Sequence, residues 1–315
     1  MLDQLLGSRV LTVNRSADFD HFRSIESLAD ARSIPLAWRD FQACFAMVKL
    51  KSCTIYLQRT FPRILEARYH STGAIIAFAM DDTFSLIING ADIRSPALLL
   101  TKGDTVCDIV EPKANLVAFI KVDAIEGRGW PGEAGHVQRI PALPAELAAL
   151  RSVTRDILLL ASNSADLLLQ PHVVEHLEES LLQAADHALQ RPSPLGDAGR
   201  LDLSDYRRLV RKLDEFLQDN AAKAVRSADL AREFGVSVRT LNNAVVAIRG
   251  LSMHRYLRLR RLWNVRQQLV QGATVETLKA IALANGFWHM GEFRSLYRDL
   301  FGETPQQTLE AAGRH

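Results

Sequence analysis

The chain has 315 residues, of which 48% are hydrophobic and 23% are charged. These values exclude a disordered or fibrous chain, and the length predicts two domains of roughly 100–200 residues each. The longest apolar run, Ala74 to Met80, is far shorter than the roughly 18 residues of a membrane-spanning helix, and the N-terminus lacks the pattern of a secretory signal. Three scattered cysteines, Cys44, Cys53 and Cys107, are typical of a reducing compartment. We therefore expect a cytoplasmic protein without membrane contact.

Charge is distributed unevenly along the chain. Residues 1–199 carry 19 Lys/Arg and 24 Asp/Glu, a net charge of −5, whereas residues 200–315 carry 19 Lys/Arg and 12 Asp/Glu, a net charge of +7. No acidic residue stands between Glu233 and Glu276, yet this segment contains seven arginines. Solvated helix faces usually mix both signs of charge, so an arginine-only segment favours contact with a polyanion such as nucleic acid.

The first 126 residues have the pattern of a β-rich domain. Residues 45–51 and 54–58 alternate apolar and polar side chains, which is the period of half-buried strands. Further short apolar runs follow, separated by turn residues such as Asn89-Gly90. These runs cover residues 74–80, 84–88, 97–100, 106–110 and 116–122. Many short strands at close spacing favour an antiparallel jelly-roll or cupin-like barrel, whose apolar interior is a reasonable pocket for a small-molecule effector.

Residues 127–191 are expected to hold a Gly- and Pro-rich connector and two helices. The first helix covers about 146–161, and the second follows Pro171 with an apolar stripe that includes Val174, Leu177 and Leu181. This stripe has two interpretations, the core of its own domain or the seam of a homodimer. Residues 192–203, rich in Pro and Gly, then predict a flexible linker.

One motif in the second of these helices suggests different chemistry. His172-Val-Val-Glu175-His176 has the His-x-x-Glu-His spacing of some zinc peptidases. A third metal ligand would have to come from elsewhere, and the region of the predicted strands, 45–122, contains His70 as its only histidine, where a metal-binding cupin needs several ligands. A metal-dependent enzyme that uses the barrel or this helix is thus the alternative function. The simpler interpretation is a polar helix face, with no metal, no cofactor and no catalytic residue.

From Ser204 to the end, the chain has the pattern of an all-α domain. Ser204, Ser227 and Ser237 each stand where a helix N-cap is expected. Gly235 supplies the positive φ that ends a short helix before Ser237 begins the next. A short helix, a Gly-containing turn and a second helix predict a helix-turn-helix.

The second helix of this unit presents candidate DNA contacts. With its apolar stripe inside, Arg239, Asn242 and Asn243 point outward near its N-terminal end, the part that reaches base edges in a major groove. Arginine pairs with guanine and asparagine with adenine, so removal of the Asn242 amide is expected to cost about 1–3 kcal/mol of discrimination at one base pair. Ser237 and Thr240 are candidate phosphate contacts.

The pattern then recurs, with a helix closed by Gly286 and another from about residue 290. The outward residues of this last helix are further base-reading candidates, namely Met290, Gly291, Arg294 and Ser295. The phosphate candidates are Arg255, Arg258 and Arg260 on the connecting helix 253–270, together with His289 and Arg298. Because Gly291 lacks a polar side chain, the first helix-turn-helix is expected to carry more of the discrimination between DNA sequences. Trp288 is expected to pack inside the domain.

These segments match a known family in order and spacing. The matching elements are Asp229-Leu-Ala, Gly235-Val-Ser, Arg239-Thr-Leu241, Tyr256-Leu-Arg258, Arg260-Arg-Leu262, Gly286-Phe287, Tyr297-Arg298, Phe301-Gly302 and Pro305. On these residues, the segment 205–310 resembles the DNA-binding domain of the AraC/XylS family of transcription regulators. The stretch from Gly286 to Phe293 is similar to a subgroup that includes the ethanolamine-utilisation activator.

The resemblance implies a function for each part of the chain. It implies sequence-specific binding to double-stranded promoter DNA, activation through RNA polymerase, a small-molecule effector in the N-terminal domain and pairing as a homodimer. The expected architecture is α+β and multidomain. It comprises a β-rich sensing domain over 1–126, a connector with helices over 127–191, a linker over 192–203 and an all-α double helix-turn-helix domain over 204–315.

Overall fold

The computed structural model describes residues 1–17, 28–37, 41–82, 84–190, 203–220, 225–271 and 275–312, with side chains of the last range from 278 onward. The chain divides into two compact units, with the break after residue 202. The predicted linker 192–203 lies, except for Leu203, outside the described residues. Within the described ranges, no helix is both long and apolar enough to cross a membrane.

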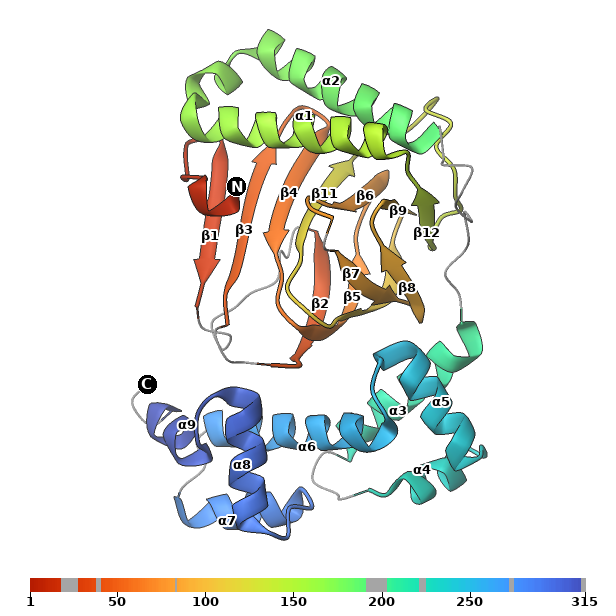
Figure 1. Cartoon of the computed structure of the whole chain (residues 1–315), viewed down its shortest axis with the longest axis vertical. Helices are drawn as coiled ribbons and strands as arrows, with labels where there is room; N and C mark the ends of the chain where they lie inside the picture. Colours follow the sequence, from red (N-terminus) through yellow and green to blue (C-terminus); the bar gives the residue numbers. More distant parts are fainter. Residues whose placement is uncertain are drawn as a thin grey trace. The chain divides into compact units, whose positions relative to one another are not determined.

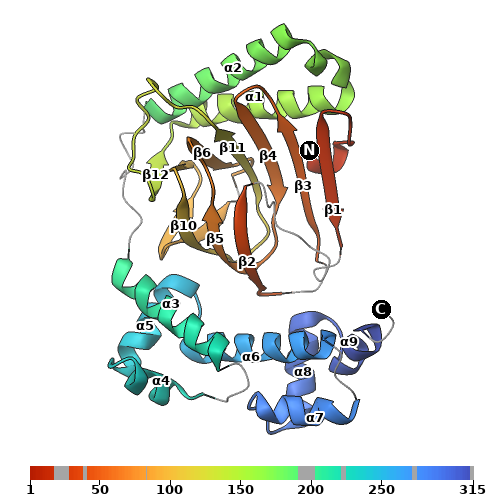
Figure 2. The ribbon, with the colours of Figure 1, turned by 180° about the vertical axis from the view of Figure 1, so that it is seen from behind.

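The first unit contains two β-sheets (Figure 1). Their strands are β1 Leu11–Ser16, β2 Ala29–Pro35, β3 Ala43–Lys49, β4 Cys53–Arg59, β5 Arg63–Tyr69, β6 Ala74–Ala79, β7 Ser85–Ile88, β8 Ala91–Arg94, β9 Ala97–Lys102, β10 Thr105–Glu111, β11 Leu116–Val122 and β12 Val137–Pro141. The seven-stranded sheet has the order β1-β3-β4-β11-β6-β9-β12, and the five-stranded sheet, seen in Figure 2, has the order β2-β5-β10-β7-β8. The predicted antiparallel β domain is therefore confirmed.

Strand alternation separates the two faces of the seven-stranded sheet. On β4, Ile55 and Leu57 belong to one apolar cluster, whereas Tyr56 belongs to a second cluster that fills the space between the sheets. The alternation continues on β11, where Ile120 joins the first cluster and Phe119 packs against the second. Both faces of this sheet are covered, so its central strands are apolar runs rather than strict alternations.

Two helices cover the outer face of the seven-stranded sheet. Helix α1 spans Pro144–Asn163 and α2 spans Pro171–Gln190, and both run across the strands (Figures 1 and 2). The stripe on α2 packs into the cluster beneath them: Leu181 is fully buried, and Val174 and Leu177 lie at its margin. A side chain without exposed surface cannot touch a partner subunit. Leu181 is thus not a dimer contact, and the structure favours the domain-core interpretation of the stripe.

Two buried or half-buried carboxylates fasten α2 to the sheet. Glu178 accepts hydrogen bonds from the Ser52 amide at 2.8 Å, the Ser52 hydroxyl at 2.6 Å and the Cys53 amide at 3.2 Å. Asp186 accepts a hydrogen bond from Trp130 Nε1 at 2.6 Å. Burial, with a contribution from Glu178, raises the pKa of the Cys53 thiol to about 12, so this cysteine is an inert core residue.

Several strands and two helix caps differ from the sequence expectations. The strands β1, β2, β5 and β8 were not predicted, and β12 lies inside the stretch expected to be a connector. Residues 137–190 share the core of the sheets, and so belong to the same unit as residues 1–126. In the second unit, Leu203 and Arg226 are the N-caps in place of Ser204 and Ser227, which are the first helical residues instead.

The second unit is helical, with one long helix between two groups of shorter ones. Its helices are α3 Ser204–Asp219, α4 Ser227–Glu233, α5 Val238–Arg249, α6 Met253–Val270, α7 Val275–Ala284, α8 Met290–Phe301 and α9 Pro305–Ala312. Helices α3 to α5 gather at the N-terminal end of α6, and α7 to α9 gather at its C-terminal end (Figures 1 and 2).

A buried ion pair holds the first group of helices to α6. The Arg249 guanidinium at the end of α5 lies 2.7 Å from the Asp214 carboxylate on α3, and both side chains are largely buried. The same carboxylate accepts a hydrogen bond from the Tyr256 hydroxyl on α6. Burial, reinforced by the Asp214 charge, raises the pKa of Tyr256, so the hydroxyl stays protonated and donates. One carboxylate therefore connects three helices.

A similar cluster holds the second group. Arg266 on α6 forms an ion pair with Glu303 and donates a hydrogen bond to the Thr308 hydroxyl at 3.2 Å. Thr308 on α9 also lies 2.8 Å from the Tyr297 hydroxyl on α8. Arg266, one of the seven arginines of the segment expected to contact a polyanion, is only 5% exposed and is paired within the domain instead. Its acidic partner stands outside the arginine-only segment.

Removal of the Asp214 carboxylate should destabilise the second unit strongly. Asp214→Ala leaves the Arg249 charge buried without its partner, which we expect to lower the free energy of unfolding by about 3 kcal/mol. Urea denaturation of the full chain measures this change. Glu215→Ala, an exposed acid one position along, is the matched control and should change stability by less than about 0.5 kcal/mol. Equal losses in the two variants would contradict the structural role of Asp214.

His70 should make the stability of the first unit depend on pH. Its Nε2 lies 2.9 Å from the Asp30 carboxylate and its Nδ1 3.6 Å from that of Asp104. The hydrogen bond with Asp30, with a smaller contribution from Asp104, raises the pKa of His70 above its usual value. The stabilisation is therefore complete below pH ~6.5 and is lost as pH rises through the raised pKa. Urea titrations at increasing pH should show wild type losing stability relative to His70→Gln, and parallel curves would refute the pairing.

Candidate nucleic-acid interface and effector cavity

The two helix-turn-helix units have the same turn. After α4, the amide of Val236 bonds to the Ala231 carbonyl at 2.9 Å and that of Gly235 to the Arg232 carbonyl at 3.2 Å. After α7, the amide of Phe287 bonds to the Ala282 carbonyl at 2.9 Å and that of Gly286 to the Leu283 carbonyl at 2.9 Å. Each is a Schellman motif with a left-handed glycine, whose φ is 66° at 235 and 82° at 286. The repeat read from the sequence is therefore a repeat of backbone geometry.

Helix α5 presents an open face near its N-terminal end. Ser237 caps the helix by accepting the Thr240 amide at 2.9 Å, and the two hydroxyls lie 2.8 Å apart. Arg239 and Asn243, four residues apart on one face, are both exposed. Val246 continues this face one turn further along and is 45% exposed. The sequence-based candidates on this helix were all polar, so Val246 was not among them.

Asn242 has a second task that the sequence did not reveal. Its side-chain oxygen accepts a hydrogen bond from the Met253 amide at 3.0 Å, at the first residue of α6, and the residue is half-buried. Bidentate recognition of adenine needs that oxygen as an acceptor. The residue expected to read a base is therefore engaged in joining α5 to α6, which leaves Arg239 and Asn243 as the unengaged polar pair of this face.

Helix α8 presents a different chemistry on the corresponding face. Gly291, Arg294, Ser295 and Arg298 are exposed, and Met290 is half-buried. A side chain at Gly291 would meet no atom within 4 Å, so this part of the helix backbone is open to an approaching partner. The face thus offers two arginines one turn apart beside a stretch of uncovered backbone.

Within the second unit, a groove of about 390 Å³ lies between the two helix-turn-helix segments, along one face of α6. His254, Arg258 and Arg261 line it from α6, and Arg261 is held there by a 2.5 Å hydrogen bond to the Val225 carbonyl. Arg255 and Arg260 stand roughly 110° to either side of this face, since successive residues of an α-helix turn by about 100°. Of the three arginines predicted on α6, only Arg258 therefore faces the groove.

The opposite wall of the groove comes from the start of α8. Trp288 and His289 line it, and both are exposed. The expectation that Trp288 packs inside is wrong, since the side chain is 71% exposed. The neighbouring Phe287 takes the inner position instead, with its ring centroid 5.1 Å from that of Phe293. Arg226 and Ser227 line it from the start of α4, and α8 adds Glu292, the one acidic residue among the described residues that line the groove.

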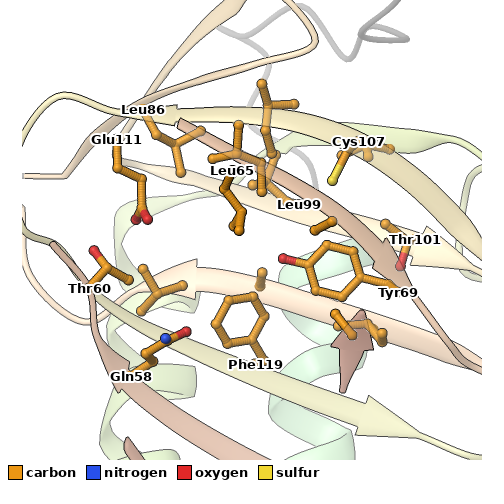
Figure 3. A pocket seen from close by; sticks show the side chains of 18 of the residues that line it. Gln58, Thr60, Leu65, Tyr69, Leu86, Leu99, Thr101, Cys107, Glu111 and Phe119 are labelled. Atoms are coloured by element: carbon orange, nitrogen blue, oxygen red, sulfur yellow. The ribbon is translucent and has the colours of Figure 1, made fainter. Parts of the chain in front are cut away.

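The first unit holds a cavity between its two sheets, with a volume of about 70 Å³ (Figure 3). Most of its wall is apolar, from residues such as Leu65, Leu99 and Phe119. Figure 3 shows the Tyr69 hydroxyl pointing toward the middle of the cavity, while Gln58 lies at one side with further polar groups. Burial raises the pKa of Tyr69, which keeps this hydroxyl neutral. The sequence could not assign these lining residues, because that requires the register of nine strands in two sheets.

The His-x-x-Glu-His motif on α2 does not gather metal ligands. Glu175 forms an ion pair with Lys51 at 2.9 Å, which lowers the pKa of that carboxyl. His172 and His176 are exposed beside it. Among the described residues, no three His, Cys, Asp or Glu side chains come close enough together to hold a metal ion. Glu175 thus ties α2 to the β3–β4 turn, as Glu178 does one helical turn further on.

Comparisons with known proteins identify a domain in the second unit and relatives that share part of the chain. A family model described as a helix-turn-helix domain matches residues 230–311. The XylDLEGF operon transcriptional activator of Pseudomonas putida is 34% identical over 96 residues, which are 30% of this chain and 30% of that protein. The probable thc operon regulatory protein of Rhodococcus erythropolis is 30% identical over 142 residues, 44% of this chain and 40% of that protein.

A solved structure matches the same part. A probable AraC family transcriptional regulator from Rhodopseudomonas palustris is 36% identical, covering 33% of this chain and 97% of that chain with a TM-score of 0.30. The match to each of the two curated relatives spans less than half of that relative's length. All these proteins are named as regulators rather than enzymes, and none is the ethanolamine-utilisation activator, so that subgroup stays a prediction. Residues 230–311 therefore form a helix-turn-helix domain, and the curated relatives that match this chain are named as transcription activators or operon regulators.

Proposed function

We propose that this protein is a sequence-specific DNA-binding transcription regulator, an activator that responds to a small molecule held in the first unit. The observation that carries the proposal is the pair of Schellman turns, one between α4 and α5 and the other between α7 and α8. Each turn leads into a helix with an exposed polar face. Two reading helices held on one rigid helix can enter successive major-groove segments, about one helical turn of DNA apart.

The first helix-turn-helix, formed by α4 and α5, would read bases. Arg239 can donate two hydrogen bonds to guanine, Asn243 can pair with adenine, and Val246 can pack against a thymine methyl group. Asn242 acts here as a positioning residue, because its bond to the Met253 amide sets the angle between α5 and α6. Ser237 and Thr240 lie at the helix start, where hydroxyls contact phosphate.

The second helix-turn-helix, formed by α7 and α8, would contribute more to DNA affinity than to discrimination between DNA sequences. Arg294 and Arg298 can hold phosphates, and the bare backbone at Gly291 allows close approach, while Ser295 and Met290 remain base-reading candidates. The groove along α6 suits the phosphate strand between two successive major-groove segments. Arg258 and His289, from its two walls, supply the cationic and hydrogen-bonding groups for that strand.

The remaining partners follow from the resemblance to AraC/XylS regulators. We infer a small-molecule effector in the cavity between the sheets, contact with RNA polymerase, and a homodimer on repeated half-sites in the cytoplasm. Because Leu181 is fully buried, the dimer would use surfaces other than the stripe on α2. No specific observation favours the alternative of a metal-dependent enzyme, since Glu175 is paired with Lys51.

Capture of genomic DNA fragments by the full-length protein tests the proposal. We expect a recurrent two-part motif, and affinity for the best fragment should fall linearly on a log–log plot against salt. Arg258→Ala should weaken specific and random DNA alike and reduce the salt slope by about 1. Sequence-blind capture, or equal affinity for every fragment, would refute sequence-specific recognition.

Arg239→Ala should separate base reading from charge. The substitution is expected to cost about 1–3 kcal/mol on the best fragment and much less on random DNA, because one guanine contact is lost. Arg211→Ala is the matched control, since it removes the same charge from an exposed position on α3. Fluorescence anisotropy with both DNAs measures the difference. If the two variants lose affinity equally, Arg239 contributes only its charge.

Gly291→Ala should raise stability and lower DNA affinity. Alanine at this helical position has free space around its Cβ, so the free energy of unfolding should rise by about 0.5–1 kcal/mol. The added methyl group would stand between the α8 backbone and DNA. Urea denaturation and anisotropy on the same sample measure both effects. A more stable variant with unchanged DNA affinity would show that DNA does not approach this backbone.

A further inference from the structure

Three buried polar groups face the cavity between the sheets without a partner. Gln58 on β4, Tyr69 on β5 and Thr101 on β9 are 7%, 8% and 6% exposed. Within the described part of the chain, the Thr101 hydroxyl is buried without a hydrogen-bond partner, whereas the Gln58 amide and the Tyr69 hydroxyl make no hydrogen bond with the protein and are open to the cavity. A buried amide or hydroxyl without a partner is costly, so native proteins retain one mainly where something else completes it.

The register of the strands explains why these groups meet. Thr101 stands opposite Ile75 on β6 and Val137 on β12, so it lies in an otherwise apolar row of the seven-stranded sheet. Gln58 stands opposite Val117 on β11 in the same sheet. Tyr69 reaches in from the facing sheet, and Figure 3 shows its hydroxyl in the space between them. Polar residues at inward positions of both sheets therefore converge on one cavity.

The charges that line the cavity cancel each other. Arg63 and Glu111 are directly opposite on β5 and β10, and the Arg63 Nε lies 2.6 Å from a Glu111 oxygen. Their side chains are 5% and 4% exposed. No other charged side chain lines this cavity among the described residues. An anionic ligand would thus find no free cation, and its burial would leave an uncompensated charge.

We propose that the cavity binds an uncharged, largely apolar molecule whose hydroxyl, carbonyl or amide group hydrogen-bonds with Gln58 and Tyr69. The inference rests on the proposed function, because it names the chemical class of that effector. Gln58 can both donate and accept, as can the Tyr69 hydroxyl, so a neutral group with either polarity is satisfied. The apolar side chains Leu65, Leu99 and Phe119 would enclose the rest of the molecule.

The cavity volume limits the size of the buried group. About 70 Å³ has room for roughly five water-sized groups, so the part that enters is a short chain or a small ring fragment. Small matched probes are therefore appropriate. Benzamide and benzoate have the same shape but differ in charge, and hexanol and hexanoate differ in the same way.

Titration calorimetry of the full-length protein with these pairs tests the proposal. We expect each neutral member to bind at least about tenfold more tightly than its carboxylate, because only the carboxylate brings an unpaired charge into the cavity. Carboxylates that bind as tightly as the neutral members would overturn the proposal. So would the absence of binding by any neutral member, since the cavity would then hold water alone.

Two variants test whether benzamide binds in the cavity. Tyr69→Phe removes one oxygen and Gln58→Leu replaces the amide by an apolar group, and each should weaken benzamide about fivefold. Gln58→Leu should also raise the melting temperature of the free protein, because the unpartnered amide is gone. Gln183→Leu, the same change at an exposed position of α2, is the matched control and should leave affinity unchanged. Loss of affinity in the control alone, or in none of the three, would overturn the assignment.

The strongest test weakens the preference of the cavity for benzamide over benzoate. Glu111→Gln leaves Arg63 without its charged partner, so benzoate should now bind at least tenfold more tightly than it binds wild type. If this variant does not fold, the Tyr69→Phe and Gln58→Leu arms still decide. DNA capture by the same wild-type preparation separates the two hypotheses. Specific DNA binding without binding of neutral probes would contradict only the present inference. Sequence-blind DNA binding would contradict the proposed function.

Discussion

Two buried arginine–carboxylate pairs hold the helices on which the second unit depends. Asp214 joins α3, α5 and α6 through Arg249 and Tyr256, and the cluster of Arg266, Glu303 and Thr308 joins α6 and α9, with Tyr297 adding α8. A buried pair is weak evidence of net stability, because desolvation offsets the attraction. Its directional hydrogen bonds nevertheless penalise any other arrangement of these helices. Each reading helix is thereby fixed to the same central helix by polar contacts that allow little rotation.

The turns of the second unit were predictable, whereas the polar contacts were not. Gly235 and Gly286 each follow a helical pattern, which predicts a left-handed glycine that ends the helix. The structure confirms the positive φ at both residues. The partners of Arg249 and Arg266 lie 35 and 37 residues away in the chain, so charge counting assigned these arginines to solvent or DNA. Asn242 shows the same limit, since nothing in its own helix reveals that the Met253 amide needs an acceptor.

In the first unit, strand type was predictable and strand position was not. Alternation identified β3 and β4, and the Asn89-Gly90 turn appears with Asn89 at a φ of 50° between β7 and β8. Short strands with mixed polarity, such as β2 and β8, have no comparable signal. The cavity depends on which residues of the two sheets oppose one another, and a shift of one residue would exchange its lining for the outer face. Gln58 and Thr101 could not be assigned without that register.

On the proposed function, the similar turns before α5 and α8 and the different chemistry of these two helices argue for a division of work between them. The α5 face combines the Arg239 guanidinium, the Asn243 amide and the exposed methyl groups of Val246. Groups of these kinds distinguish base pairs in the major groove. The α8 face has lost a side chain at Gly291 and presents two arginines, which suit phosphate and guanine equally. Because α6 fixes both helices, each contact made by α8 limits the position of α5 along DNA. A weakly discriminating second helix then still sharpens recognition by the first, since it restricts the register in which Arg239 and Asn243 can meet a base.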